Sequence, residues 1–456
     1  MTNNMCVVVG GGVVGLLAAY LAKQKFDRVV LVESSKNLGG LLGSFDIEGA
    51  TYDYGTHFAS LTHIEDLNNI LFGSADERKA AYNYFPYLRT ENYFNGRWHL
   101  TSSLINTKNL PSDEYAQGVI ELLEAPGTED DETNLYRYLI ATFGETFTEK
   151  VYRPVLKKLL DTDLEEINKD ILSVFGLLRL IALTPEATNQ LKTICNYDNS
   201  LGYHSYKDGD PNHSYCYPKG DVGIGYWSSY LLKKVKSLGV DIVTENTVTN
   251  IEHRDSLITS VTLSDERKIE CDHVLWTPPP ALALMAADIE FNSKLPSFRT
   301  YTLCHFEFEK AFTKTIPQFL YCWDASMLTY RVTLYPNINE GRACFGRHNL
   351  TIEVLSDKTA ENRTDEIQSI VLDELRIMKI VSDDNLLLHS KVQYMGNSFP
   401  VITTEFLESS KNIQQLVNSH FNNMTLLGRS AGATFSVNDL LIETYEKMKE
   451  LEVASG

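Results

Sequence analysis

The chain has 456 residues, enough for two interleaved domains, and 43% of them are hydrophobic, which suits a large buried core. A formal net charge of −19 argues against a nucleic-acid binder, because such a protein needs a basic surface to displace counterions. The same charge argues against docking on an anionic membrane surface, although a local arginine pocket still permits an anionic substrate.

The seven cysteines are scattered and form no CxxC pair, so neither a zinc ribbon nor a redox motif is indicated. We therefore expect free thiols and a cytoplasmic protein. The N-terminal apolar run leads directly into glycines without a preceding basic region, which indicates a strand rather than a signal peptide. No stretch of about 18 uncharged apolar residues is present, so we expect no membrane span.

The first predicted element is a strand that begins near Cys6 and ends in a glycine-rich loop. Gly10, Gly12 and Gly15 match the pattern G-x-G-x-x-G ahead of a predicted helix and a second apolar strand. The first glycine permits a sharp turn, the second leaves room for a pyrophosphate, and the third lets the helix pack against the strand. The helix N-terminus offers free N–H groups to phosphates. This stretch predicts a Rossmann-type βαβ unit that binds a dinucleotide.

Glu33 ends the second strand, 18 residues after Gly15. An acid at this place binds both ribose hydroxyls and disfavours a 2′-phosphate, which indicates NAD or FAD. The residues that follow Glu33 distinguish between NAD and FAD. A nicotinamide dehydrogenase would continue into another helix and strand, whereas this chain makes a glycine-rich crossing with Gly39, Gly40 and Gly43.

Beyond the crossing comes "YDYGTHF", which contains Asp53, Gly55 and His57. At this point the sequence resembles the flavoprotein group of amine oxidases, protoporphyrinogen oxidases and UDP-galactopyranose mutases. The resemblance implies that Gly39 and Gly40 run along the FAD pyrophosphate and flavin. It also implies that the acid-x-Gly-x-His segment passes near the flavin ring.

Three later segments carry the same resemblance. "YPKGDVGIGYWSSYLLKKVKSLGVDIVTENTVTNIE" resembles the group's second FAD segment, with Val248 against the adenine. "CDHVLWTPPPALAL" resembles the strand and proline crossover that leaves the FAD domain. "MTLLGRSAGATFSVNDLLIETYEKM" resembles the closing motif, in which a strand ends in Gly428 and Arg429, and a helix beginning with Asn438 and Asp439 faces the flavin. Four segments in the right order imply that the cofactor is FAD.

These segments imply an α/β fold in which a Rossmann-type FAD-binding domain is interleaved with an α+β substrate-binding domain. We predict that the FAD-binding domain is discontinuous and that the substrate-binding domain fills the intervening stretches. The FAD-binding domain is assigned to residues 1–75, 212–285 and 405–456, and the substrate-binding domain to residues 76–211 and 286–404.

Within the substrate-binding domain, residues 94–100 alternate around a turn and predict a hairpin. Residues 134–160 have apolar positions at helical spacing, and Pro154 is expected to break or kink that helix. Alternating residues at 299–312 and around Arg331 predict strands. The polar stretch 184–215 is the predicted mobile loop.

His57 and Arg331 are the catalytic candidates. Near a flavin, the His57 imidazole acts as acid or base around neutral pH, and the alternative is a loop histidine that bonds only backbone. In "YRVTLYPN", Arg331 resembles a mutase arginine that clamps the substrate diphosphate, and the alternative is a strand arginine paired with an acid. No Cys-His-Asp set or metal-ligand spacing is recognised, so no metal site is predicted.

The resemblance implies an FAD-dependent enzyme, either an oxidoreductase or a mutase, and we expect a phosphate-bearing small-molecule substrate such as a nucleotide sugar. The closing segment has Ala433, Thr434 and Phe435 where the mutases carry a tyrosine-rich stretch. That departure leaves open an oxidase of an amine or a porphyrinogen-like ring. A non-catalytic flavin-binding scaffold is a third alternative, and the sequence does not indicate an oligomeric state.

Overall fold

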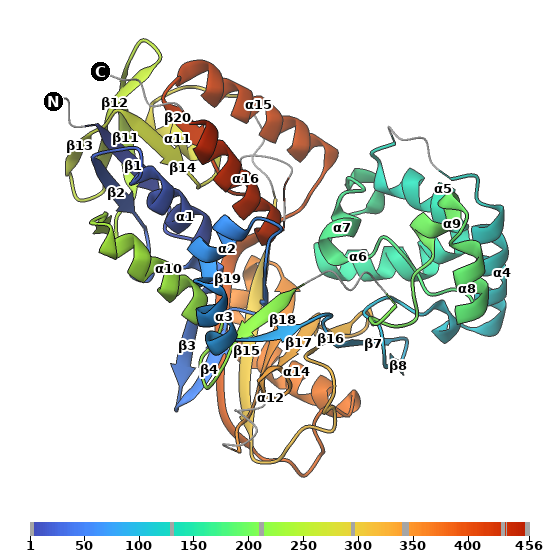
Figure 1. The fold of residues 1–456 in the computed structure, drawn as a ribbon. Helices are drawn as coiled ribbons and strands as arrows, with labels where there is room; N and C mark the ends of the chain where they lie inside the picture. The colour runs from blue at the N-terminus through green and yellow to red at the C-terminus, as the bar shows by residue number, and fades with distance from the viewer. Residues whose placement is uncertain are drawn as a thin grey trace.

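The computed structural model confirms an α/β protein with a Rossmann-type parallel sheet. Figure 1 shows that sheet beside a second, larger sheet, with the helices of residues 112–200 gathered at one side of the larger sheet. The assignment of exact domain boundaries stays a prediction. The structure describes residues 4–127, 132–208, 214–292, 297–339, 346–429, 434 and 436–451.

The parallel sheet has the strand order β10-β2-β1-β14-β20, and all neighbouring strands in it run parallel. Its strands are nearly continuous apolar runs because both faces are covered. In β1, Cys6 and Val8 pack with the helices of one face, whereas Val7 and Val9 pack with the elements of the other. The strands are β1 (Met5–Val9), β2 (Arg28–Val32), β10 (Asp241–Val243), β14 (His273–Trp276) and β20 (Met424–Leu426).

One face of this sheet is covered by helices and the other by a small antiparallel sheet with two further helices (Figure 1). The first face carries α1 (Val13–Ala22), α10 (Gly225–Ser237) and α16 (Val437–Glu450). The second carries β11 (Val248–Arg254), β12 (Leu257–Leu263), β13 (Lys268–Glu270), α11 (Pro280–Ala286) and α15 (Thr404–His420).

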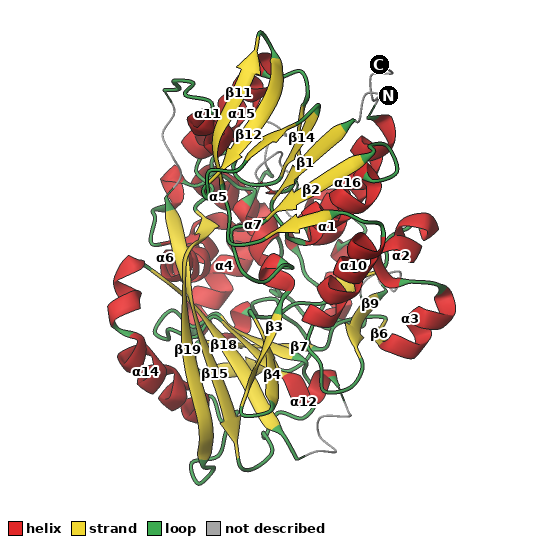
Figure 2. Ribbon diagram, turned by 90° about the vertical axis from the view of Figure 1, so that its left-hand side faces the viewer, coloured by secondary structure: helices red, strands yellow, loops and turns green. Residues whose placement is uncertain are grey.

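The larger sheet has the order β19-β15-β18-β17-β16-β7-β8, and α14 (Thr364–Ile377) packs on it, as Figure 2 shows. Only the β16–β7 pair is parallel among the pairings of its described strands. The strands are β7 (Thr90–Phe94), β8 (Arg97–His99), β15 (Phe298–Phe308), β16 (Phe319–Cys322), β17 (Arg331–Leu334), β18 (His348–Ser356) and β19 (Leu387–Pro400).

Short elements connect these parts. The hairpin of β3 (Ser44–Ile47) and β4 (Ala50–Asp53) leads to β5 (Ala59–Ser60), which shares a small sheet with β9 and β6. The remaining elements are α2 (Glu65–Phe72), α3 (Ala75–Ala81), β6 (Tyr82–Phe85), α4 (Ser112–Glu124), α5 (Leu135–Phe147), α6 (Arg153–Leu160), α7 (Ile171–Phe175), α8 (Pro185–Leu191), α9 (Cys195–Ser200), β9 (Tyr215–Pro218) and α12 (Tyr335–Ile338).

The predicted hairpin is confirmed, because β7 and β8 pair through a turn in which Asn95 and Gly96 both have positive φ. The predicted helix over 134–160 is interrupted ahead of Pro154 by a π-helical turn, and also at Gly144, whose φ is 80°. The predicted mobile loop at 184–215 was wrong over residues 185–200, where α8 and α9 form, whereas residues 201–208 and 214 belong to no helix or strand. Residues 209–213 of that prediction lie outside the described residues. In α8, Thr184 caps the helix by accepting the N–H of Ala187.

Among the helices of the described part, none combines the length and apolar character that a membrane crossing needs. Within the same residues, no group of three or more His, Cys, Asp or Glu side chains is arranged to hold a metal ion.

The turn between β16 and β17 is held by charged groups from two helices. The ammonium of Lys158 on α6 donates to the carbonyls of Cys322, Asp324 and Thr329 at 2.9, 2.9 and 2.7 Å. The carboxylate of Glu374 on α14 accepts the backbone N–H and the hydroxyl of Thr329 at 2.8 and 2.6 Å. Hydrogen bonds to charged groups are the stronger ones, so this turn is rigidly placed.

We predict that Lys158→Met lowers the free energy of unfolding by about 3 kcal/mol, because three carbonyls lose a charged donor while the aliphatic stem is kept. The matched control is Lys157→Met on the same helix, where the ammonium only meets the exposed Asp161 and Asp163. That control is expected to change stability by less than about 0.5 kcal/mol. Urea unfolding followed by circular dichroism measures both values, and equal effects would contradict the assignment.

Candidate active site

The carboxyl ends of the parallel strands meet at one edge of the sheet, where α/β proteins bind their ligands. The glycine-rich loop follows β1 there, and Gly10 N–H donates to the Val32 carbonyl of β2 at 2.8 Å. On the other side, Leu427 N–H after β20 donates to the Trp276 carbonyl of β14 at 2.8 Å. The predicted cofactor loops therefore start from adjacent strands.

The three glycines of the first loop have different surroundings. A Cβ at Gly10 would lie 2.1 Å from the Thr277 hydroxyl oxygen, and a Cβ at Gly15 would lie 1.8 Å from the Gly10 carbonyl oxygen. At Gly12, by contrast, a Cβ would meet no protein atom within 4 Å. Gly12 is the N-cap of α1, so the open space lies at the end of the helix that attracts phosphate. This cradle fits a pyrophosphate.

The second glycine cluster lies directly against the first. The Gly39 N–H donates to the Gly11 carbonyl at 2.8 Å, and Gly39 forms an isolated bridge with Gly12. Gly39 and Gly40 have φ values of 109° and 58°, a backbone region that favours glycine. The structure thus brings the two clusters together, and their contact with FAD stays a prediction.

Glu33 lies between the glycine loop and Val248, at the start of β11. Its carboxylate accepts the Gly11 N–H at 2.6 Å, while its own carbonyl accepts the Asn246 N–H at 3.1 Å. Pyrophosphate, ribose and adenine follow one another in FAD. The spatial order of glycine loop, acid and Val248 fits that order, although none of these residues' roles is tested by the structure.

The closing segment lies at the same edge. Gly428, with φ of 82°, comes two residues after β20, and Arg429 follows it. Asn438 and Asp439 lie in the first turn of α16, as predicted from the sequence. The side-chain oxygen of Asn438 is buried without a hydrogen-bond partner in the described part of the chain. Ala433 and Phe435 lie outside the described residues.

The "YDYGTHF" segment is anchored by a buried carboxylate. Asp53 accepts hydrogen bonds from the Ser44 hydroxyl at 2.6 Å, the Tyr217 hydroxyl at 2.6 Å and the Ile224 N–H at 2.9 Å. These partners come from β3, β9 and the approach to α10, so one side chain ties three elements together. The acid of the acid-x-Gly-x-His pattern therefore positions the segment that carries His57.

Arg331 is paired with an acid that the sequence analysis did not select. Arg331 on β17 and Glu353 on β18 lie directly opposite each other in register. The Arg331 Nε and Nη2 atoms lie 2.8 and 2.7 Å from the two carboxylate oxygens of Glu353. The side chain of Glu353 is 3% exposed and that of Arg331 is 20% exposed. A charged residue within the apolar run "LTIEVLS" was the available signal, since a buried acid requires a partner.

His57 belongs to the same electrostatic cluster. Its Nε2 lies 3.2 Å from the Tyr54 carbonyl, and the residue as a whole is half-buried. Burial lowers the pKa of His57 to about 4, the negative charge of Glu353 opposes this, and the positive charges of Arg331 and Arg429 add to it. His57 is therefore neutral at pH 7, able to donate from one ring nitrogen and accept at the other.

Aromatic side chains surround the guanidinium of Arg331. Its central carbon lies 5.5 Å from the ring centre of Tyr330 and 5.9 Å from that of Tyr321. Tyr321 stacks on Trp323 with ring centres 4.7 Å apart. Burial raises the pKa of the nearby Tyr301, and the charge of Glu353 adds to this, so its phenol is neutral and can donate. The sequence analysis did not select these aromatic residues.

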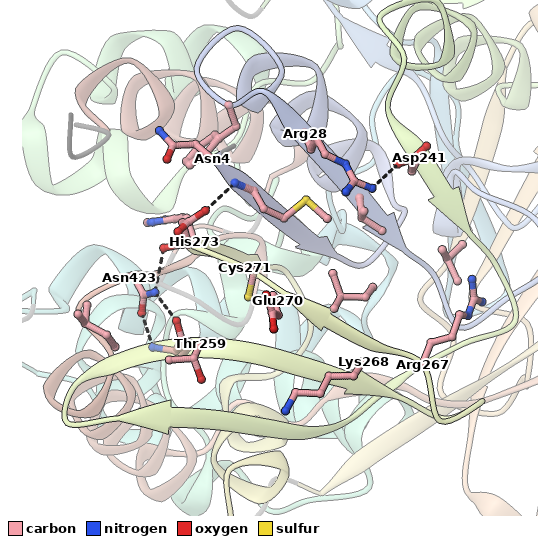
Figure 3. Close-up of a pocket in the computed structure, with 18 of the residues that line it drawn as sticks. Asn4, Arg28, Asp241, Thr259, Arg267, Lys268, Glu270, Cys271, His273 and Asn423 are labelled. Carbon is pink, nitrogen blue, oxygen red and sulfur yellow. Dashed lines mark hydrogen bonds and ion pairs between the residues drawn. The ribbon is translucent and has the colours of Figure 1, made fainter. Parts of the chain in front are cut away.

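A hollow of about 1470 Å³ lies elsewhere, at the amino ends of the same strands (Figure 3). Four of its charged side chains form ion pairs: Arg28 with Asp241, Arg267 with Asp265, and Lys268 with Glu252. The Asn423 side chain at its rim bonds backbone groups. The glycine loops are at the opposite ends of the strands, so this hollow is separate from the candidate active site.

Comparison with known proteins identifies the class. The family described as flavin containing amine oxidoreductase matches residues 15–430, and the chain belongs to it. The protein is therefore an FAD-dependent enzyme, and the scaffold alternative is not retained.

Solved structures with the same fold include a reduced UDP-galactopyranose mutase, with 17% identity, a TM-score of 0.78, and 98% of this chain and 95% of that chain covered. A candidate protoporphyrinogen oxidase from Exiguobacterium sp. 255-15 has 16% identity and a TM-score of 0.69, with 99% of each chain covered. A putrescine oxidase bound to putrescine has 14% identity and a TM-score of 0.61, with 98% of each chain covered. At these identities the likeness shows the fold alone.

A shorter relative comes from Methanothermococcus thermolithotrophicus, where it is described as an uncharacterized protein in the nifH2 3′ region. It is 43% identical over 65 residues, which are 14% of this chain. The chain covers 63% of that relative's length.

The contrast between two glycines gives a test of the cofactor cradle. Gly12→Ala is expected to weaken FAD binding by roughly 1–3 kcal/mol, because the added methyl group fills the predicted pyrophosphate space. The same change should alter the stability of the apoprotein by less than about 1 kcal/mol, since no protein atom is near. Gly15→Ala instead clashes with Gly10 and should destabilise the apoprotein by roughly 1–3 kcal/mol.

FAD titration of apoprotein and thermal unfolding without FAD measure the two effects separately. If Gly12→Ala destabilised the apoprotein as much as Gly15→Ala, the open cradle would be disproved.

Proposed function

We propose that the protein is an FAD-dependent enzyme that acts on a phosphate-bearing small molecule, such as a nucleotide sugar. The observation that carries this proposal is the guanidinium of Arg331. Two of its nitrogens hold Glu353, and no hydrogen bond to another described residue is made by Nη1. An arginine donor left open in a partly exposed position suits a phosphate oxygen.

The local charge supports an anionic ligand. Arg331 and Arg429 bring two positive charges to the cluster around His57, and Glu353 brings one negative charge. The cluster is therefore positive within a chain whose formal net charge is −19. A local field of this sign attracts an anion and disfavours a cation, whatever the net charge of the protein.

Proposed roles follow for the candidate residues. Bound FAD supplies the electron-transfer chemistry of the family. Arg331 would orient the substrate through its phosphate, and the half-buried rings of Tyr301 and Tyr321 would flank it. His57, neutral at pH 7, would exchange a proton with the substrate or hydrogen-bond the flavin.

An oxidase of an amine or porphyrinogen-like ring is the second candidate. The aromatic rings of Tyr321 and Tyr330 favour it, because such faces also attract an ammonium group or an extended ring. The family match is compatible with both candidates.

We predict that Arg331→Ala weakens the binding of UDP, used as the nucleoside diphosphate probe, by roughly 1.5–3 kcal/mol. FAD content should be unchanged, because Arg331 lies on the larger sheet and not at the glycine loops. Arg331→Lys should recover part of the loss, since it keeps the charge without the planar fork. The change in flavin absorbance on adding UDP measures the dissociation constant.

The matched control is Arg347→Ala, which breaks a comparable pair with the buried Glu307. Arg347 precedes β18 and lies six residues from Glu353, about 20 Å along an extended strand. It should leave UDP binding unchanged. If UDP leaves the flavin spectrum of the wild type unaltered while an amine bleaches it, the oxidase candidate replaces this proposal.

We also propose a reducing, cytoplasmic location, based on free thiols. Six cysteines are unpaired within the described residues, and five of them are buried. Burial raises the pKa of Cys216 to about 12 and of Cys322 to about 11, which makes these thiols unreactive in the folded protein. A thiol reagent should therefore label the exposed Cys195 in the native state and the buried five only after denaturation. Stable disulfides among them would contradict the proposal.

A further inference from the structure

Glu353 has more partners than a simple ion pair requires. One carboxylate oxygen accepts the Arg331 Nε–H at 2.8 Å and the Thr56 N–H at 2.8 Å. The other accepts the Arg331 Nη2–H at 2.7 Å. Glu353 therefore binds the proposed substrate arginine on β17 and also the segment between Gly55 and His57, predicted to face the flavin.

The backbone around Glu353 is adapted to this contact. Gly55 has φ of 101°, and a Cβ there would lie 3.0 Å from the carboxyl carbon of Glu353. A side chain at Gly55 would push the carboxylate away from the Thr56 N–H. A second tie follows, since the hydroxyl oxygens of Thr56 and Thr333 lie 2.5 Å apart. Gly55 is thus required for close approach of the two segments as well as for its predicted role near FAD.

The position of Glu353 within the sheet limits its movement. β18 is a central strand, paired with β15 on one side and β17 on the other, and its residues from 349 to 355 are buried. Burying a carboxylate is costly unless its oxygens are matched by well-placed donors. Here every donor is fixed by a strand or a short backbone segment, so the geometry of the pair is determined by the fold.

We propose that Glu353 is a positioning residue that holds the Arg331 guanidinium and the Thr56–His57 segment in one fixed arrangement. It leaves the Nη1 side of Arg331 directed away from the carboxylate and available to substrate. The part that concerns substrate rests on the proposed function, whereas the part that concerns His57 depends only on the protein.

The first test is a double-mutant cycle with FAD-loaded wild type, Glu353→Gln, Arg331→Ala and the double variant, each titrated with UDP. If Glu353 acts through Arg331, Glu353→Gln weakens UDP binding by about tenfold in the wild type and by less than about twofold in the Arg331→Ala background. A loss of the same fold in both backgrounds overturns the proposal. The control Glu307→Gln removes an equally buried acid of another ion pair and should leave UDP binding unchanged.

The second test follows His57 by NMR in FAD-loaded protein labelled at histidine, without UDP. The groups that act on His57 are Glu353, Arg331, Arg429 and the Tyr54 carbonyl. Glu353→Gln removes the negative charge, so the pKa of His57 should fall below about 4 and the ring should stay neutral on acidification. A general loosening would admit water and raise that pKa toward 6.5. A rise therefore overturns the proposal, and Glu307→Gln should cause neither change.

The two tests separate the two proposals. If the wild type does not bind UDP but Glu353→Gln lowers the pKa of His57, the phosphate-bearing substrate is wrong and the contact of Glu353 with the Thr56–His57 segment stands. If UDP binds through Arg331 and the cycle is additive, the positioning role is wrong. If Glu353→Gln does not yield folded holoenzyme, Glu353→Asp replaces it in the cycle, because aspartate keeps the charge on a shorter side chain. The weakening of UDP binding that Glu353→Asp causes must then also disappear in the Arg331→Ala background.

Discussion

The buried pair of Arg331 and Glu353 is the constraint around which the candidate active site is arranged. A guanidinium and a carboxylate can occupy the middle of a sheet only when their donors and acceptors are matched, because desolvation otherwise exceeds their attraction. The register of β17 and β18 supplies that match. Lys158 and Glu374 then hold the β16–β17 turn from opposite sides, so the strand that carries Arg331 cannot slide without breaking charged hydrogen bonds. The site thus derives its geometry from the interior of the larger sheet.

The geometry of the FAD-binding side depends on a different constraint, which is the absence of side chains at its glycines. Gly15 lets α1 touch the loop after β1, and Gly12 keeps the space at the helix N-terminus empty. Asp53 connects this side to the substrate side, because it anchors the segment that ends in His57, and Glu353 receives the Thr56 N–H of the same segment. One short stretch of chain is therefore fixed by a carboxylate at each end, and the two halves of the molecule meet there.

The sequence predicted the βαβ unit of the FAD-binding side because the requirements of that unit are local. The spacing of Gly10, Gly12, Gly15 and Glu33 reflects one βαβ unit, and the structure contains that unit. The substrate half depends on pairing between distant strands. The ion pair of Glu353 is evident only when the register of β17 and β18 places this residue opposite Arg331, and no local sequence pattern encodes that register. The helices within 185–200 were missed for a related reason, since α8 and α9 are polar and neither buries a stripe of apolar side chains.

The occupied fork of Arg331 bears on how the site selects a ligand. An arginine with a free fork would recognise any phosphate by two parallel hydrogen bonds. Here Glu353 takes the Nε and Nη2 donors, so under the proposed function Nη1 is the donor left for a phosphate oxygen. Under the proposed function, discrimination between ligands would come from the aromatic surroundings, where Tyr321 stacks on Trp323 with ring centres 4.7 Å apart. A ligand that carries both an anionic group and a flat or sugar ring satisfies these two features together, whereas a free phosphate satisfies only one of them.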